Sequence, residues 1–432
     1  MKSVWTTHGE PKRFASLENN IHTDVLIIGG GITGILCAHM LKNAGVECVL
    51  AEADRLCNGI TQNTTAKITL GHGLVYDKLI KRYGEEKARL YLQANCRAGE
   101  RYARLCREMD CDYEKQDSYV YSLDDRNKIA REIKALNRLG AKAAFSDAPQ
   151  LPFSVAGAVR VEGQAQFHPL KFAYQLAKDL LVYENTKVVE VSPHKAVTPR
   201  GEIRCQKMII ATHFPMINKH GGYFLKLYQH RSYVLALEGA PQVDGMYVDE
   251  ADTGLSFRHY GRLLLLGGGG HRTGKSGGCW QELERVAKTY YPHATIVGRW
   301  ATQDCMTLDR VPYIGPYSNR TPDLFVATGF NKWGMTSAMV AAGILCDLVR
   351  GKSNPYAEVF APSRSMLHPQ LAVNAFESMV GLLTPTAPRC PHLGCALKYN
   401  PAEHSWDCPC HGSRFTEAGE LINNPATDDT QW

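Results

Sequence analysis

Two short segments near the C-terminal end carry cysteine and histidine at spacings that suit a metal centre. The first is Cys-Pro-His-Leu-Gly-Cys, in which one residue separates Cys390 from His392. The second is Cys-Pro-Cys-His-Gly-Ser, in which two residues separate Cys408 from His411. Two thiolates suit one iron and two neutral imidazoles suit another, as in a mixed-ligand [2Fe–2S] centre. These four residues are the predicted metal ligands, and a structural zinc site or a decayed domain are the alternatives left open.

A glycine-rich turn lies near the N-terminal end. It follows the apolar run Asp-Val-Leu-Ile-Ile-Gly at 24–29, which is typical of a strand buried on both faces. Gly29, Gly31 and Gly34 occupy the glycine positions of G-x-G-x-x-G, where a pyrophosphate can approach the backbone at a helix N-terminus. Glu52 ends the next predicted strand, where an acid accepts ribose hydroxyls. The pattern predicts a dinucleotide site but does not by itself choose between FAD and NAD.

The elements that must position these residues alternate between helices and strands. Residues 76–139 are charge-rich and helix-like, 335–350 predict a helix, and 351–362, with two prolines and a glycine, predict a linker. Shorter strands are predicted at 155–161, 187–191, 207–211, 233–237, 263–266 and 325–328.

The composition of the 432-residue chain is that of a globular protein, with 44% hydrophobic and 21% charged residues. No apolar run approaches the ~18–20 residues of a membrane span, and no signal peptide is visible. The net charge of +6 is scattered, so we expect no nucleic-acid partner. Most cysteines before residue 347 stand in apolar surroundings, which predicts reduced thiols and a cytoplasmic protein, with peripheral membrane contact left open.

Three further segments carry a family resemblance: 63–69 (NTTAKIT), 211–215 (ATHFP) and 330–336 (FNKWGMT). With the glycine turn, they resemble the D-amino-acid-oxidase-type family of FAD-dependent oxidoreductases over about residues 20–355. More narrowly, they are similar to a bacterial branch with a fused C-terminal Rieske domain. The resemblance implies that FAD is bound by Gly29, Gly31, Gly34, Glu52, Thr65, Ala66, Val188, Gly329 and Met335.

Both Cys/His segments are similar to the Rieske family. That resemblance implies that Cys395 and Cys410 form the disulfide found in many members. Only residues 363–389 lie between the predicted linker and Cys390, which is too few for the strands that normally precede the first cluster segment. We therefore expect an abridged domain whose cluster is covered by residues of the flavin domain.

The fold implied is α/β (α+β): a Rossmann-like FAD-binding domain with an inserted mixed-sheet substrate domain, plus a small β-rich Rieske-type domain. Residues 1–360 would form the oxidoreductase unit and residues 361–432 the abridged Rieske [2Fe–2S] domain. Within the first unit we expect FAD-binding parts at about 20–80, 150–215 and 300–350, and substrate-domain parts at about 81–149 and 216–299.

The expected function joins two kinds of electron carrier. A flavin takes two electrons from an organic donor, whereas a [2Fe–2S] cluster passes one at a time. We therefore expect an oxidoreductase, a dehydrogenase rather than an oxidase, that oxidises a small amine or amino acid at FAD. Electrons would pass singly to the cluster and on to a one-electron acceptor, either a protein or a quinone. The alternatives are an electron-transfer or redox-sensing protein without metabolite turnover, and a flavin oxidase with a structural zinc site.

Four residues are candidates for the substrate side of the flavin. Arg231 and Tyr233 project from one face of a predicted strand, and Arg258 stands where relatives place an arginine for a substrate carboxylate. A guanidinium fork suits a carboxylate, although these arginines could equally pair with acids or flavin phosphates. Lys332 is expected near the flavin ring.

Overall fold

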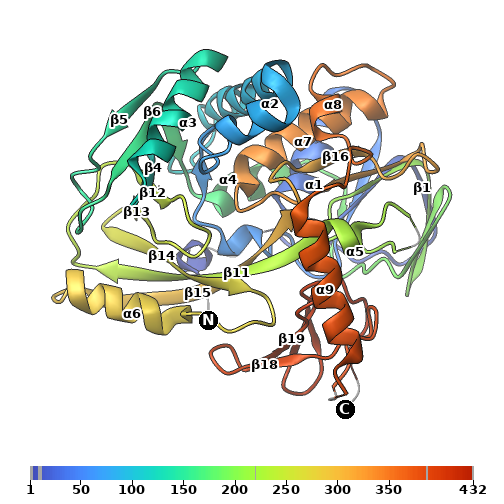
Figure 1. Cartoon of the computed structure of the whole chain (residues 1–432). Coiled ribbons are helices and arrows are strands. Elements are labelled where there is room, and N and C mark those ends of the chain that lie inside the picture. Colours follow the sequence, from blue (N-terminus) through green and yellow to red (C-terminus); the bar gives the residue numbers. More distant parts are fainter. Residues whose placement is uncertain (1–2, 8–11, 219, 386–387, 431–432) are drawn as a thin grey trace.

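The computed structural model describes residues 3–7, 12–218, 220–385 and 388–430, and contains two large sheets and one small one (Figure 1). The first sheet runs through β16 (Tyr313–Pro316), β17 (Leu324–Thr328), β10 (Gly201–Ile210), β1 (Ile21–Ile28), β2 (Cys48–Ala51) and β7 (Val182–Tyr183). Two short strands, β8 (Glu190–Ser192) and β9 (Lys195–Thr198), extend it beside β10.

Strand β1 lies in the middle of this sheet and pairs in parallel with both β2 and β10. Its last four residues are at most 4% exposed, as the continuous apolar run predicts for a strand covered on both faces. The turn after β1 leads into α1 (Ile32–Asn43), which packs against α7 (Gly334–Val349) and α4 (Pro169–Ala177). The βαβ unit read from the sequence is therefore confirmed.

The first and second sheets together belong to the larger unit of the protein, which precedes α9 (Pro369–Leu383). The order of the second sheet is β15 (Thr295–Thr307), β11 (Leu227–Glu238), β14 (Leu263–Arg272), β13 (Ser256–Tyr260), β12 (Met246–Asp249), β4 (Glu114–Ser122), β6 (Gly157–Gln166) and β3 (Lys67–Ile68), with β5 (Ala143–Ser146) beside β6. Helix α6 (Cys279–Tyr290) packs on β11 and β14, and α3 (Arg126–Leu139) packs on β5 and β6.

The expectation of a helix-like segment throughout residues 76–139 is wrong in its middle. Helix α2 (Tyr76–Cys106) bends at Gly84, whose φ is +82°, and strand β4 then separates it from α3. Strand β4 ends in an aromatic and β-branched run, Ser-Tyr-Val-Tyr-Ser, which favours a pleated strand over a helix. Because charged residues stand on both sides of this run, the change from the helical spacing of apolar residues to the alternating spacing of a strand was not recognised in the sequence.

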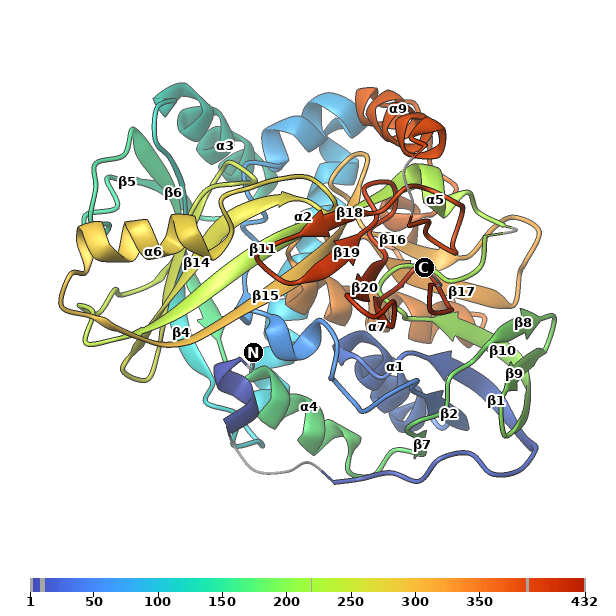
Figure 2. The same ribbon diagram turned by 90° about the horizontal axis from the view of Figure 1, so that it is seen from below.

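The C-terminal part consists of a helix and a small antiparallel sheet (Figure 2). Helix α8 (Ala357–Phe360) lies within the expected linker, and α9 (Pro369–Leu383) follows it. The sheet then runs through β18 (Lys398–Asn400), β19 (Ser405–Asp407), β20 (Arg414–Thr416) and β21 (Leu421–Asn423). Three short helices complete the elements: η1 (Val4–Thr7), η2 (Thr61–Asn63) and α5 (Tyr223–Lys226). The expected mixed α/β fold with a small β-rich C-terminal region is confirmed.

Helix α9 precedes the first cluster segment and packs closely against it. Its N-terminus is capped by the His368 ring, which accepts the Gln370 N–H at 3.1 Å. Near its other end, the Gly381 carbonyl accepts the Ala396 N–H at 2.9 Å. A Cβ on Gly381 would lie 2.5 Å from the Cys410 sulfur, so the helix can approach only because this residue is glycine. Among the residues described, no helix is long and apolar enough to cross a membrane.

Candidate functional site

A cavity of about 1110 Å³ runs from the glycine turn after β1 to the strands of the second sheet. Gly29 needs the absence of a side chain, because a Cβ there would lie 2.6 Å from the Ala211 carbonyl oxygen. Gly34 needs it more strongly, since its Cβ would lie 1.9 Å from the Gly29 oxygen. Gly31 opens α1 at the cavity wall. The three glycines therefore keep the turn tight and its backbone open to a ligand.

Glu52 ends β2 at the same wall of the cavity. Its carboxylate accepts the Gly30 N–H at 2.5 Å and the Asp54 N–H at 2.9 Å. Burial raises the pKa of Glu52, and these two N–H groups oppose the rise. Val188 lines the same region, as the resemblance implies for a contact to adenine.

The other residues implied in FAD binding fall on or beside the cavity. Thr65, Gly329 and Met335 line it. Ala66 lies behind the wall, fully buried at a φ of +54°, and its carbonyl accepts an N–H of Arg258 at 2.9 Å. A cavity of this length, with its glycine turn and acid, fits a dinucleotide, while the role of each residue stays a prediction.

The four predicted cluster ligands come together between the small sheet and α5. The rings of His392 and His411 lie 4.9 Å apart, and Cys390 and Cys408 are both at most 1% exposed. A hydrogen bond shared by the two thiols lowers the pKa of Cys390 to about 7 and raises that of Cys408. Two sulfurs and two imidazoles thus lie within one buried site.

The ring nitrogens of these histidines fit a metal centre. Nδ1 of His392 and both ring nitrogens of His411 are buried and have no hydrogen-bond partner in the described part of the chain. Burial lowers the pKa of His392 to about 4, so its ring is neutral, and its Nε2–H donates to Asn218 Oδ1 at 2.9 Å. That bond leaves the lone pair on Nδ1, as a metal ligand requires.

A disulfide joins Cys395 and Cys410 beside this site. The two sulfurs lie with that of Cys408 within 4.8 Å of one another, a grouping that suits a metal by distance alone. Oxidised sulfurs offer no thiolate, however, so the disulfide removes Cys395 and Cys410 from the ligand set. The pairing that the resemblance implied is present in the structure.

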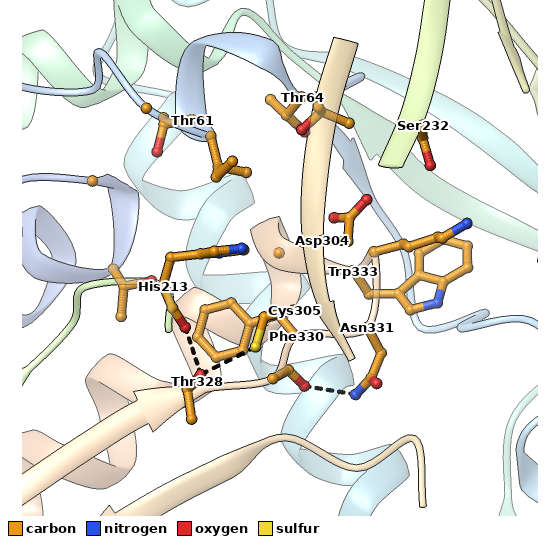
Figure 3. A pocket seen from close by; sticks show the side chains of 18 of the residues that line it. Thr61, Thr64, His213, Ser232, Asp304, Cys305, Thr328, Phe330, Asn331 and Trp333 are labelled. Atoms are coloured by element: carbon orange, nitrogen blue, oxygen red, sulfur yellow. Dashed lines mark hydrogen bonds between the residues drawn. The ribbon is translucent and has the colours of Figure 1, made fainter. Parts of the chain in front are cut away.

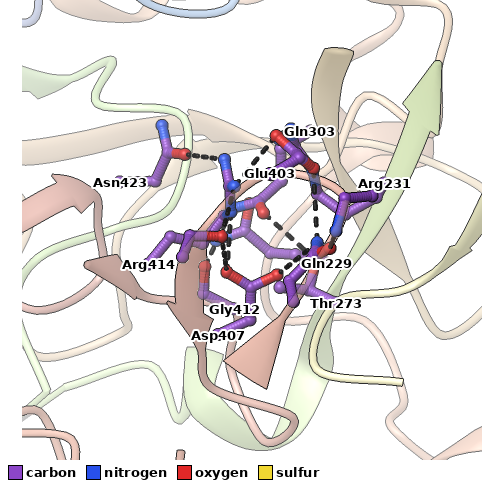
Figure 4. A network of polar contacts seen from close by, with 12 residues as sticks. Gln229, Arg231, Thr273, Gln303, Glu403, Asp407, Gly412, Arg414 and Asn423 are labelled. Atoms are coloured by element: carbon purple, nitrogen blue, oxygen red, sulfur yellow. Dashed lines mark hydrogen bonds and ion pairs between the residues drawn. The ribbon is translucent and has the colours of Figure 1, made fainter. Parts of the chain in front are cut away.

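Amide side chains of the second sheet hold the cluster segment (Figure 4). Gln229 on β11 donates through Nε2 to the His411 carbonyl at 3.1 Å and to that of Asn424 at 3.0 Å. Gln303 on β15 donates to the Gly412 carbonyl at 2.9 Å. A Cβ on Gly412 would lie 2.5 Å from that of Gln229, so the approach needs glycine. The expectation that the flavin domain covers the abridged domain is confirmed.

A buried charge network lies next to these amides. Arg231 donates Nε–H to Glu403 Oε1 at 2.9 Å and makes a second contact through Nη2. Arg414 donates to the other oxygen of Glu403 at 2.9 Å and to Asp407 at 2.9 Å. Burial opposes ionisation of Glu403, but the two guanidinium groups hold its pKa at about 2. The network therefore ties the small sheet to β11 by an ion pair with little access to water.

One segment belongs to both the cavity and the cluster site. His213 follows β10, lines the cavity (Figure 3) and places its Nε2 3.1 Å from Gln229 Oε1. Burial lowers the pKa of His213 to about 4, so the ring is neutral. Phe214 is fully buried, with its ring centre 6.3 Å from that of His392 and 6.4 Å from that of His411. The two sites thus share a wall of adjacent residues.

The four substrate-side candidates do not form one site, although Arg231 and Tyr233 both donate to Glu403 Oε1, at 2.9 Å and 3.0 Å. Tyr233 and Lys332 line the cavity, and Lys332 donates to the Asp252 carbonyl at 2.6 Å. The Arg231 guanidinium forms an ion pair with the carboxylate of Glu403. Arg258 is 1% exposed and donates to three carbonyls: Thr65 at 2.6 Å, Ala66 at 2.9 Å and His259 at 3.0 Å. Both arginines are therefore engaged inside the protein.

Several residues of these sites carry no local sequence signal. Gln229 and Gln303 stand on strands whose pairing was not predicted, and Asn218 lies in an irregular segment. Glu403 and Asp304 are single acids without a motif. Their roles depend on which strands pair, and a single sequence does not show this.

Comparison with known proteins agrees with this geometry. Residues 24–348 match the family model described as FAD dependent oxidoreductase, and residues 366–431 match that of the Rieske [2Fe-2S] domain. The protein named Putative Rieske 2Fe-2S iron-sulfur protein YhfW, from Bacillus subtilis (strain 168), is 34% identical over 98% of this chain and 96% of its own length.

Two more distant matches cover mainly the larger unit. Gamma-glutamylputrescine oxidoreductase of Escherichia coli (strain K12) is 24% identical over 79% of this chain and 87% of its own. The crystal structure of glycine oxidase from Geobacillus kaustophilus superposes with a TM-score of 0.66 and 18% identity, over 80% of this chain and 99% of that one. At that identity the structural likeness supports the fold alone.

Proposed function

Because the chain belongs to the FAD dependent oxidoreductase family and carries a Rieske [2Fe-2S] domain, we propose that it oxidises a small amine or amino acid at FAD and passes the electrons singly to the cluster. Its cofactors are FAD and a Rieske-type [2Fe–2S] cluster. When bound, FAD supplies two-electron oxidation of the donor and the cluster supplies one-electron transfer. In this proposal the enzyme is a dehydrogenase, and the final electron acceptor is a protein or a quinone.

The proposed binding residues follow from the two sites. The chain would hold FAD with Gly29, Gly31, Gly34, Glu52, Thr65, Ala66, Val188, Gly329 and Met335, and the cluster with Cys390, His392, Cys408 and His411. We place the division between the oxidoreductase unit and the Rieske unit near residue 360, before α9.

The observation that carries the proposal is the wall shared by the two sites. A continuous set of hydrogen bonds leads from His213 at the cavity, through the Gln229 amide, to the backbone of His411. Phe214 is buried beside it, between the cavity segment and the two histidine rings. The adjacency of the two sites supports electron transfer within the chain.

The test is anaerobic mixing of the holoprotein with a panel of amines and amino acids. We expect one class of donor to bleach the FAD absorbance and to produce the electron paramagnetic resonance signal of a reduced Rieske cluster. In Cys408→Ser, which lacks a predicted ligand, the FAD should still bleach without that signal. Bleaching with a cluster that stays oxidised would refute the transfer.

Two other outcomes would replace the proposal. A cluster that is reduced chemically, together with FAD that no donor bleaches, would indicate an electron-transfer or sensing protein. Zinc instead of iron in metal analysis would indicate a flavin oxidase with a structural metal site.

A further inference from the structure

An acidic side chain faces the cavity on the side of the second sheet. Asp304 lies on β15, paired with His230 of β11, and Figure 3 shows its carboxylate in the open space of the cavity. Within the described part of the chain, no hydrogen bond or ion pair engages this carboxylate, unlike Asp252, which is bound by Arg310. Burial raises the pKa of Asp304 to about 6, and the charges of Lys332 and Arg231 oppose that rise without forming a direct contact, so the carboxylate still gains from a cation bound against it.

The guanidinium groups on this side of the cavity are already paired. Arg310 lines the cavity and directs both terminal nitrogens to the carboxylate of Asp252. Arg231 is bound by Glu403, and Arg258 donates to backbone carbonyls. A substrate carboxylate would therefore have to displace an internal partner to gain a bidentate contact.

Five lysines line the cavity. Lys67, Lys128, Lys187 and Lys332 each have an acceptor within the protein, and the fifth, Lys78, is exposed to solvent. The Lys332 ammonium donates to the Asp252 carbonyl at 2.6 Å, and that of Lys67 donates to Thr65 Oγ1 at 3.0 Å. Burial, together with the charge of Arg258, lowers the pKa of Lys67 to about 7, so this group is a weak anion site at neutral pH.

An aromatic face lines the same cavity. Trp333 stacks on His72 with ring centres 5.1 Å apart and an interplanar angle of 17°. His72 is held by the Tyr91 hydroxyl at 2.7 Å and by Thr336 Oγ1 at 3.1 Å, and burial lowers its pKa to about 3. The indole is thus fixed on a neutral support at the cavity wall, and an aromatic ring in such a wall attracts a cation.

We propose that the donor is a cationic amine that carries no carboxylate close to its reacting amine, and that Asp304 selects this donor by binding its ammonium group beside Trp333. This inference rests on the proposed function and narrows it, since it separates amines from amino acids. Asp304 acts here as a specificity-determining residue, because its charge attracts the ammonium group and repels a carboxylate.

The test measures binding to the oxidised holoprotein and needs no turnover. The probes are choline, its neutral isostere 3,3-dimethylbutan-1-ol, and acetate, each followed by the visible spectrum of bound FAD and by tryptophan fluorescence. In the unaltered protein choline should bind at least tenfold more tightly than the neutral alcohol. Asp304→Asn should remove most of that difference, Asp304→Glu should retain part of it, and acetate should bind more tightly to Asp304→Asn than to the unaltered protein.

The matched control is Asp244→Asn, which removes one carboxylate from an exposed turn away from the cavity. Equal FAD content and thermal stability of the variants exclude a folding defect. Equal binding of choline and the neutral alcohol, or preference for acetate in the unaltered protein, would overturn the inference. If choline binds through Asp304 but no donor bleaches the FAD, the ammonium site stands, while the proposed function fails and with it the assignment of the bound cation as an electron donor.

Discussion

The ion pair between Arg231 and Glu403 offers the sharpest test of how the small sheet is held. We expect Glu403→Gln to destabilise the protein strongly, because it leaves two buried guanidinium groups with less negative charge. A carboxyl whose pKa falls from 4.5 to about 2 on folding contributes about 3.4 kcal/mol at neutral pH, at 1.36 kcal/mol for each pH unit. The expected loss in the free energy of unfolding is therefore about 3 kcal/mol.

The sign of the pH dependence follows from the same values. The pKa of Glu403 is lower in the folded protein than in the unfolded chain, so its contribution is complete above pH 4.5 and is lost as the pH falls toward 2. Urea unfolding at a series of pH values, followed by tryptophan fluorescence, measures this. The unaltered protein should lose stability over that window, and Glu403→Gln should lose less.

The control is Glu238→Gln, at a half-exposed glutamate 3.4 Å from Arg262 on the same sheet. An exposed pair of this kind should change the free energy of unfolding by no more than about 0.5 kcal/mol. Because Arg231→Met breaks the same contact as Glu403→Gln, the double variant should lose less than the sum of the two single losses. Equal effects of Glu403→Gln and Glu238→Gln, or strict additivity, would refute the reasoning.

Three further predictions concern other parts of the molecule. Gly34→Ala should yield protein without FAD absorbance, because its Cβ would lie 1.9 Å from a backbone oxygen, whereas Gly99→Ala, where nothing lies within 4 Å, should keep its FAD; equal FAD content would contradict this. Cys395→Ser opens a disulfide to Cys410 that spans 15 residues and should cost about 3 kcal/mol in urea unfolding, matching the unaltered protein under reductant. Burial opposes ionisation of Asp309, but its buried partner Arg364 holds the pKa of Asp309 at about 2, below the ordinary 3.8. Asp309→Asn should therefore remove about 2.4 kcal/mol from the free energy of unfolding, and the unaltered protein should lose the same amount as the pH falls from 3.8 toward 2. A free energy of unfolding that does not change over this pH range would contradict the prediction.

The parts of the fold that the sequence predicts are those in which a local pattern has one physical cause. The run 24–29 ends at a glycine turn whose geometry admits no side chain, so strand, turn and helix could be placed from the order and spacing of the residues. The prediction of a helix throughout residues 76–139 was wrong in its middle, because charged residues are spaced similarly on an exposed helix and at the end of a strand.

The candidate site divides in the same way. The ligand set around Cys390 and Cys408 could be predicted, since cysteine and histidine at fixed short spacing have few other uses. The environment of Arg231 could not be predicted, because it depends on Glu403, 172 residues away in the turn between β18 and β19. Long-range pairing of this kind leaves no trace in a single sequence.

The inward-facing histidine rings have a consequence for assembly. Nδ1 of His392 and both ring nitrogens of His411 are buried, so we expect iron and sulfide to be delivered before the small sheet docks on the larger unit. Once it has docked, the amides of Gln229 and Gln303 cover the backbone around His411. We therefore expect the rate at which this contact opens, more than the affinity of the four ligands, to limit the loss of iron to a chelator.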